Sequence, residues 1–150
     1  MASSIASARL ALHALLAAHT WPGTQPQVTF GAPGGYEEQE IVALLGVQDP
    51  DEEFAALGAH RKAESYVLEV GVKAHDPGAA DAQTVDTRAF ALAEAVRVVV
   101  NANPTFAGAV PTTVLPAQVI SQTSEGAQAA EGGGWVCFIR LLVRCQTRIF

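Results

Sequence analysis

The chain has little positive charge and no long apolar run. Its 150 residues include nine Lys and Arg against fifteen Asp and Glu, a net charge of −6. This balance argues against a protein whose whole surface holds nucleic acid or an anionic membrane. The longest apolar stretch, Leu10 to Ala18, contains His13 and is far too short to span a bilayer. Because it also lacks the basic start and cleavage pattern of a secretion signal, we expect a chain that is not exported by that route.

Cysteine is nearly absent as well, with only Cys137 and Cys145 in the chain. The alternation around them predicts one strand, in which eight residues separate their Cα atoms by about 26 Å, far beyond the reach of a disulfide. We therefore expect two buried free thiols, which suits a reducing compartment.

Signatures of catalysis and of metal binding are missing too. No Cys-x-x-Cys occurs, and no two of His13, His19, His60 and His75 have the spacing of metal ligands on one face of an element. No Gly-x-Ser-x-Gly elbow is present, and the glycine-rich turn 31–35 lacks the Lys-Ser/Thr of a phosphate loop. We predict no enzymatic activity, no cofactor and no metal site. A small-ligand enzyme whose site assembles from distant positions is the remote alternative.

Acidic residues are present in two runs, Glu37, Glu38 and Glu40, and then Asp49, Asp51, Glu52 and Glu53. The second run lies in a segment, 48–62, that we predict to be an exposed acidic loop. Its alternating carboxylates resemble the first ligands of a calcium loop. Phe54 and His60 stand where such a loop needs Gly and Glu, which favours a solvated loop over a cation site.

Hydrophobic periodicity predicts two helices and five strands. Helices are expected over 3–20, with Ser3 or Ser4 as N-cap, and over 81–103, with an apolar stripe of period 3.6. Strands are expected over 27–30, 40–47, 64–75, 112–123 and 135–149. Pro22 and Pro104 end the helices, because proline forces the residue before it out of the helical region.

The order α-β-β-β-α-β-β predicts one α+β domain over residues 1–150. We expect a mainly antiparallel sheet of four to five strands, with both helices packed on one face and a long C-terminal hairpin. The tract 124–134 is polar and rich in Ala and Gly, and is expected to be a flexible hairpin tip.

The last strand carries an uneven share of the charge. Residues 1–112 hold 13 acids and 6 bases, whereas residues 113–150 hold 2 acids and three arginines, Arg140, Arg144 and Arg148. Alternation places these arginines on one face, as a stripe about 26 Å long, opposite an apolar face. These arginines have three possible roles: ordinary solvated charges, partners for carboxylates of a neighbouring copy, or the lining of a ring lumen. Arginine suits contacts with a neighbouring copy because its planar guanidinium binds a carboxylate in two places.

One motif points to a family. The long Ala/Val-rich helix is followed by Asn103-Pro104-Thr105-Phe106-Ala107-Gly108-Ala109-Val110, then by a strand, a hairpin and a long final strand. This resembles the tail terminator (tail completion) proteins of long-tailed bacteriophages, whose turn reads Asp/Asn-Pro-Thr-Leu-Gly-Gly-Val. Residues 64–72 are similar to the family's Glu-x-Tyr-x-Leu-x-Val-x-Val strand, and the resemblance covers nearly the whole chain. Phe106 and Ala107 depart from the commoner Leu and Gly.

The resemblance implies a non-enzymatic virion subunit, assembled in the host cytoplasm and located at the tail–neck junction. It implies a homo-hexameric ring that caps the head-proximal end of the tail tube, stops tube polymerisation and docks the head connector or stopper protein. It further implies that DNA passes through the lumen without sequence-specific binding and that no membrane is involved. Head-completion and stopper proteins of the neck share this size and fold, and remain the alternative.

A closed ring needs complementary contacts between different faces of successive subunits. The candidate contact residues for such an interface, or for a lumen, are the three arginines of the last strand and the two acidic runs: Arg140, Arg144, Arg148, Glu37, Glu38, Glu40, Asp49, Asp51, Glu52 and Glu53.

Overall fold

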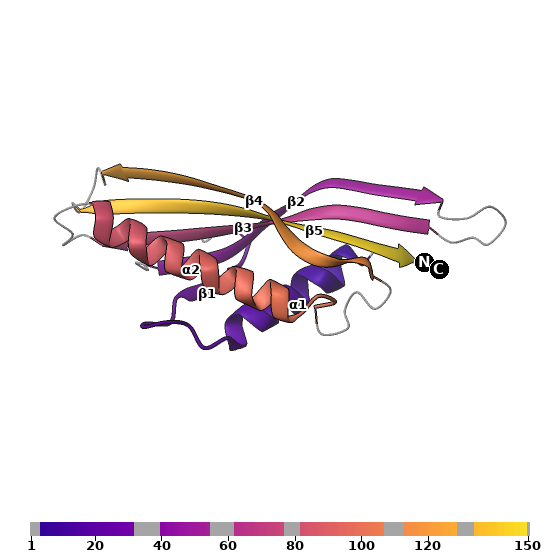
Figure 1. Ribbon diagram of the computed structural model, residues 1–150, viewed down its shortest axis with the longest axis horizontal. Coiled ribbons are helices and arrows are strands. Elements are labelled where there is room, and N and C mark those ends of the chain that lie inside the picture. Colours follow the sequence, from indigo (N-terminus) through magenta and orange to yellow (C-terminus); the bar gives the residue numbers. More distant parts are fainter. Residues whose placement is uncertain are drawn as a thin grey trace.

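The protein forms two layers, a sheet and a pair of helices. The computed structural model describes residues 4–31, 40–54, 62–76, 82–106, 113–128 and 134–149. The elements are α1 (Ile5–Ala18), β1 (Gln27–Phe30), β2 (Glu40–Phe54), β3 (Lys62–Asp76), α2 (Ala82–Ala102), β4 (Thr113–Gln128) and β5 (Trp135–Ile149). Both helices lie on the same side of the sheet (Figure 1). The predicted α+β class and element order are confirmed.

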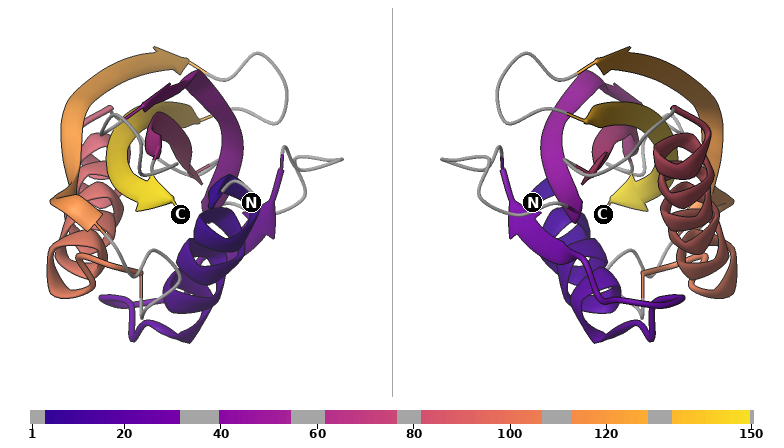
Figure 2. Two further views of the ribbon diagram at one scale, coloured as in Figure 1. Left: turned by 90° about the vertical axis from the view of Figure 1, so that its right-hand side faces the viewer. Right: turned by 90° about the vertical axis from the view of Figure 1, so that its left-hand side faces the viewer.

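The five strands form one mixed sheet in the order β1-β2-β3-β5-β4. The short β1 runs parallel to β2, and every other pair is antiparallel. β3 and β5 pair without a register shift from Lys62 opposite Ile149 to Asp76 opposite Trp135. The last strand of the chain therefore lies inside the sheet, and the sheet curves over both helices when viewed along its long axis (Figure 2).

Two segments predicted as loops are strands over much of their length. β2 continues to Phe54, so the first part of the predicted acidic loop 48–62 pairs with β3, after a register shift near Pro50. β4 continues to Gln128, which pairs with Trp135, so the predicted hairpin tip 124–134 begins too early. Both strands extend further than predicted for the same reason. A long neighbouring strand supplies backbone hydrogen-bond partners, and a segment with polar side chains can still pair with it through its backbone. Residues 55–61 and 129–133 of these segments lie outside the described residues.

The hydrophobic core fills the space between the sheet and the helices. The predicted stripe of α2 is confirmed, and the inner face of β5 packs against it through Cys137, Ile139, Leu141, Val143 and Cys145. α1 adds Ala8, Leu12 and Leu16. Both cysteines are buried and free, as the alternation predicted.

A buried carboxylate fixes the start of α1. Ser4 is the N-cap, as predicted, yet its side chain makes no capping bond to the helix. Its backbone N–H and its hydroxyl instead donate to Glu64 Oε1 on β3, at 2.9 and 2.6 Å, and the hydroxyl also lies 2.9 Å from Tyr66 Oη. Glu64 is 2% exposed. Its negative charge stands at the positive end of the helix dipole, which ties α1 to the sheet.

Ser4→Ala is expected to lower the free energy of unfolding by about 1–2 kcal/mol, because it removes hydrogen bonds to two buried oxygens at the helix start. Ser7→Ala is the matched control: Ser7 is exposed in the same helix, and alanine there is expected to be neutral or slightly stabilising. Urea titration followed by circular dichroism measures both. Equal effects of the two variants would contradict a special role for Ser4.

Candidate functional site

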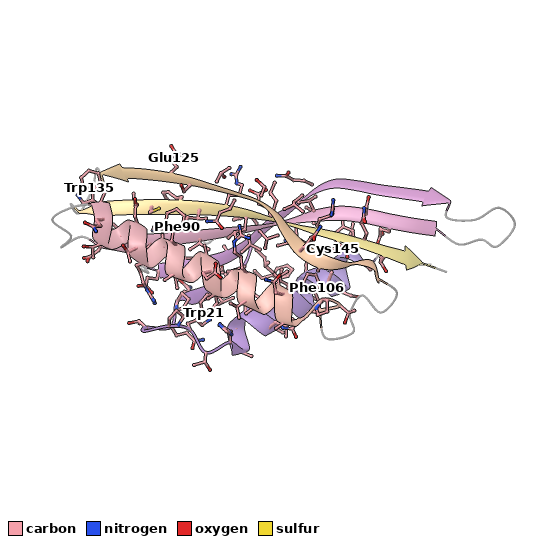
Figure 3. All side chains as sticks on the ribbon, in the orientation of Figure 1. Trp21, Phe90, Phe106, Glu125, Trp135 and Cys145 are labelled. Carbon is pink, nitrogen blue, oxygen red and sulfur yellow. The ribbon has the colours of Figure 1, made fainter. Side chains whose placement is uncertain are left out.

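The face of the sheet opposite the helices brings four strands into register. Two neighbouring rows of paired residues, here called rungs, cross β2, β3, β5 and β4 in that order. The first rung is Ala43, Gly71, Arg140 and Thr123, and the second is Ile41, Lys73, Phe138 and Glu125. Partners in a ladder point to the same side, so these side chains share one surface. Glu125, labelled in Figure 3, stands on the side of the sheet away from α2.

This surface is hollowed. A groove of about 470 Å³ lies over the two rungs, and Leu45 also lines it. Gly71 opens its centre: a Cβ there would lie 2.8 Å from Leu45 Cδ1, so any side chain would displace Leu45. Ile41 and Ala43 are buried at 2% and 4% exposure, although they lie on the far side of the sheet from the core. We call this feature the sheet groove.

Two cations flank the apolar floor of the sheet groove. Lys73 is 8% exposed, and its burial lowers its pKa. Arg140 Nε donates to Glu69 Oε1 at 2.7 Å, while 59% of the Arg140 side chain stays exposed. Glu69 Oε2 accepts a second bond from Gln48 Nε2 at 3.0 Å. β2, β3 and β5 are thus linked on this face by one polar chain.

The predicted arginine stripe is only partly described. Arg140 lies on the outer face. Arg144 lies four residues later on the same face, half-buried, between Val67 and Gln118 of the neighbouring strands. Arg148 is placed by its backbone alone, opposite Ala63. Whether these arginines contact another copy stays a prediction.

The acidic candidates are not brought to the arginines within one chain. Glu40 points to the helix side, where its two oxygens accept from Arg88 Nε and Nη2 at 2.8 Å each. It therefore already has a partner in its own chain. Glu37 and Glu38 lie outside the described residues, and Asp49, Asp51, Glu52 and Glu53 are placed only by their backbone in β2.

Several residues of the sheet groove were not among the candidates. The signal was present in the run Ile41 to Leu45, which is apolar at consecutive positions. A strand that is apolar on both sides indicates two covered faces, whereas strict alternation indicates one. Lys73 and Phe138 carried no comparable local signal, because their burial and position depend on pairing across the sheet.

The two cysteine thiols lie on the core side of the sheet, away from the sheet groove. Burial raises the pKa of Cys145 to about 12. Burial and a hydrogen bond that the thiol donates to Asp86 raise the pKa of Cys137 to about 11, so both thiols are protonated and weakly nucleophilic at neutral pH. Within the described ranges, no three His, Cys, Asp or Glu side chains are grouped to hold a metal ion. No helix among the described residues is long and apolar enough to cross a membrane. An apolar floor with a charged rim is typical of protein interfaces.

Comparison with known proteins gives a likeness of fold. No family model matches the chain, and no curated protein matches it. Among solved structures, one chain of the virion of a native gene transfer agent (GTA) particle superposes with a TM-score of 0.59. The match covers 99% of this chain and 100% of that chain, at 15% sequence identity.

Proposed function

We propose that this protein is a structural subunit of a phage-like virion. One observation carries the proposal: the fold is shared end to end with a chain of a gene transfer agent virion, with 99% and 100% of the two chains covered. Because one fold can serve several functions, the finer role rests on the sequence motif at the end of α2.

The finer proposal is a tail terminator that forms a homo-hexameric ring on the tail tube and docks the head connector. The first four residues of the motif that resembles the family, Asn103 to Phe106, form a tight turn after α2. Phe106 lies fully buried with φ 48°, and its N–H donates to Asn103 O at 2.9 Å. Asn103 Nδ2 donates to Val99 O at 2.8 Å, and Ala117 N–H donates to Pro104 O at 3.0 Å. A buried non-glycine residue with positive φ, held by these hydrogen bonds, supports an architectural role for the turn at the end of α2.

Native mass spectrometry on the protein, alone and mixed with tail tube subunits, tests the ring. Six copies per assembly are the expected result. A protein that stays monomeric under both conditions contradicts the proposal. Electron microscopy of the protein mixed separately with tail tubes and with head connectors then distinguishes the two neck roles: density at the tube end supports a terminator, and density on the head connector supports a stopper.

Arg144→Glu is expected to weaken ring assembly more than folding, because the residue lies half-buried on the outer face and the change reverses its charge. Arg9→Glu on α1 makes the same charge change near the Phe30 ring, 4.7 Å away, and serves as the control. Assembly is followed by native mass spectrometry and folding by thermal melting. Parallel losses of melting temperature and assembly would make Arg144 a support of the fold instead.

A further inference from the structure

The exposed side of α2 carries an apolar ridge with one charge in its middle. Phe90 and Val98 are 43% and 49% exposed, although both are large apolar residues. Exposed Glu94 lies between them at four-residue spacing, so the three side chains follow one ridge of the helix. At 1.5 Å per residue the ridge is about 12 Å long. We call it the helix ridge.

The sheet groove, on the opposite side of the molecule, is close to the helix ridge in size. Four strands at about 4.8 Å spacing make it roughly 14 Å wide, close to the length of the helix ridge. Its floor is formed by the buried Ile41 and Ala43, and Glu125 also lines it. Its exposed part carries the ring of Phe138 and the guanidinium of Arg140, which keeps 59% of its side chain exposed although its Nε is paired with Glu69. Phe138 is itself 44% exposed.

We infer that the helix ridge of one copy packs into the sheet groove of the next copy. Phe90 and Val98 would cover the exposed ring of Phe138, and the carboxylate of Glu94 would meet the exposed guanidinium of Arg140. The inference rests on the proposed ring and names the surfaces that close it. A ridge and a groove on opposite sides of one subunit produce the head-to-tail contact that a closed ring requires.

The other exposed aromatic near the helices is engaged within its own chain. Phe30 has the guanidinium of Arg9 at 4.7 Å from its ring centroid and the His13 ring at 5.8 Å. Phe90 and Phe138 have no such ring or cation contact among the described residues. Because Phe90 and Phe138 lack such contacts within the described part of the chain, their exposed rings favour the helix ridge and the sheet groove as surfaces that another copy covers.

Two single variants, each disabling one surface, test the pairing. Phe90→Lys replaces an apolar contact by a cation beside Arg140, and Phe138→Glu sets a carboxylate against Glu94. Each variant alone is expected to lose ring assembly, with an association constant at least about 30-fold lower than that of the unmodified protein. Leu10→Lys, at a 61% exposed position of α1 outside both surfaces, is the matched control and should assemble normally.

Mixing the two variants is the decisive step. The Phe138→Glu copy keeps its helix ridge and the Phe90→Lys copy keeps its sheet groove, so the mixture is expected to form a heterodimer through this one intact pair of surfaces. Native mass spectrometry resolves the two copies by mass. If a variant melts well below the unmodified protein, Glu94→Lys and Thr123→Glu replace the pair, because both positions are exposed.

The outcomes separate this inference from the proposed function. Rings formed by both variants overturn the ridge-in-groove contact and leave the ring proposal standing. Variants that stay monomeric singly and in the mixture also overturn it, because an intact ridge and an intact groove then fail to pair. An unmodified protein that never forms rings, alone or with tube subunits, overturns the proposed function itself.

Discussion

Arg88→Ala is expected to lower the free energy of unfolding by about 3 kcal/mol, because one side chain joins three elements. From α2, Arg88 binds both oxygens of Glu40 on β2 at 2.8 Å. Its Nη2 also donates to Thr24 O at 2.6 Å and its Nη1 to Pro22 O, between α1 and β1. The pair is only about one-fifth exposed. Removing the guanidinium leaves a largely buried carboxylate and two carbonyls without their donor.

Arg97→Ala is the matched control, because Arg97 lies on the same helix and donates to Gln122 Oε1 at 2.9 Å. We expect it to lower the free energy of unfolding by about 1 kcal/mol. Arg88→Lys should fall between the two, since an ammonium cannot span the acceptors that the planar fork reaches. Urea unfolding at neutral pH measures all three. Equal losses for Arg88→Ala and Arg97→Ala would show that the three-element contact adds no stability.

Raising the pH from 9 to 11 is expected to remove about 4 kcal/mol of folding stability through the two thiols. The thiols have an ordinary pKa of 9.0, and burial raises it to about 11 for Cys137 and about 12 for Cys145. The folded state therefore keeps its protons while the unfolded state loses them. The stability is fully present below pH 9 and falls with rising pH, by up to about 1.4 kcal/mol per pH unit for each thiol.

Two further groups act in the same alkaline range. Burial also raises the pKa of Tyr66, which adds to the loss above its ordinary value of 10.0. Burial lowers the pKa of Lys73, so Lys73 acts in the opposite direction: its contribution to the free energy of unfolding increases as the pH rises toward its ordinary value of 10.5. The thiols are isolated by comparing the unmodified protein with the Cys137→Ala, Cys145→Ala double variant, under reducing conditions. If free energies of unfolding at pH 8 to 11 fall equally steeply in both proteins, the thiols are not the cause.

Local periodicity was sufficient for several elements. The bounds of β1 and β5 were predicted at the residues where the structure has them, because strict alternation marks each end. α2 differs from its prediction by one residue at each end. Proline and the loss of the apolar stripe define a helix end locally, so no distant contact is needed to place it.

The ends of β2 and β4 and the partner of Glu40 were not predictable in the same way. Asp51 and Glu53 are polar residues that follow Pro50, a composition typical of a loop, yet both pair with residues of β3 in the sheet. Glu40 was expected to face another copy, whereas Arg88, 48 residues later in the chain, binds it. Both outcomes depend on which segments the fold places side by side.

The sequence by itself determined the element order, the burial of both thiols and the outward placement of Arg140, because each follows from a period of 2 or 3.6 along the chain. Only the tertiary structure decided the sheet groove. Gly71, Lys73, Phe138 and Ile41 come from three strands and meet through the register of their ladders. A register is a relation between segments far apart in the chain, and no local pattern in any one of them encodes it.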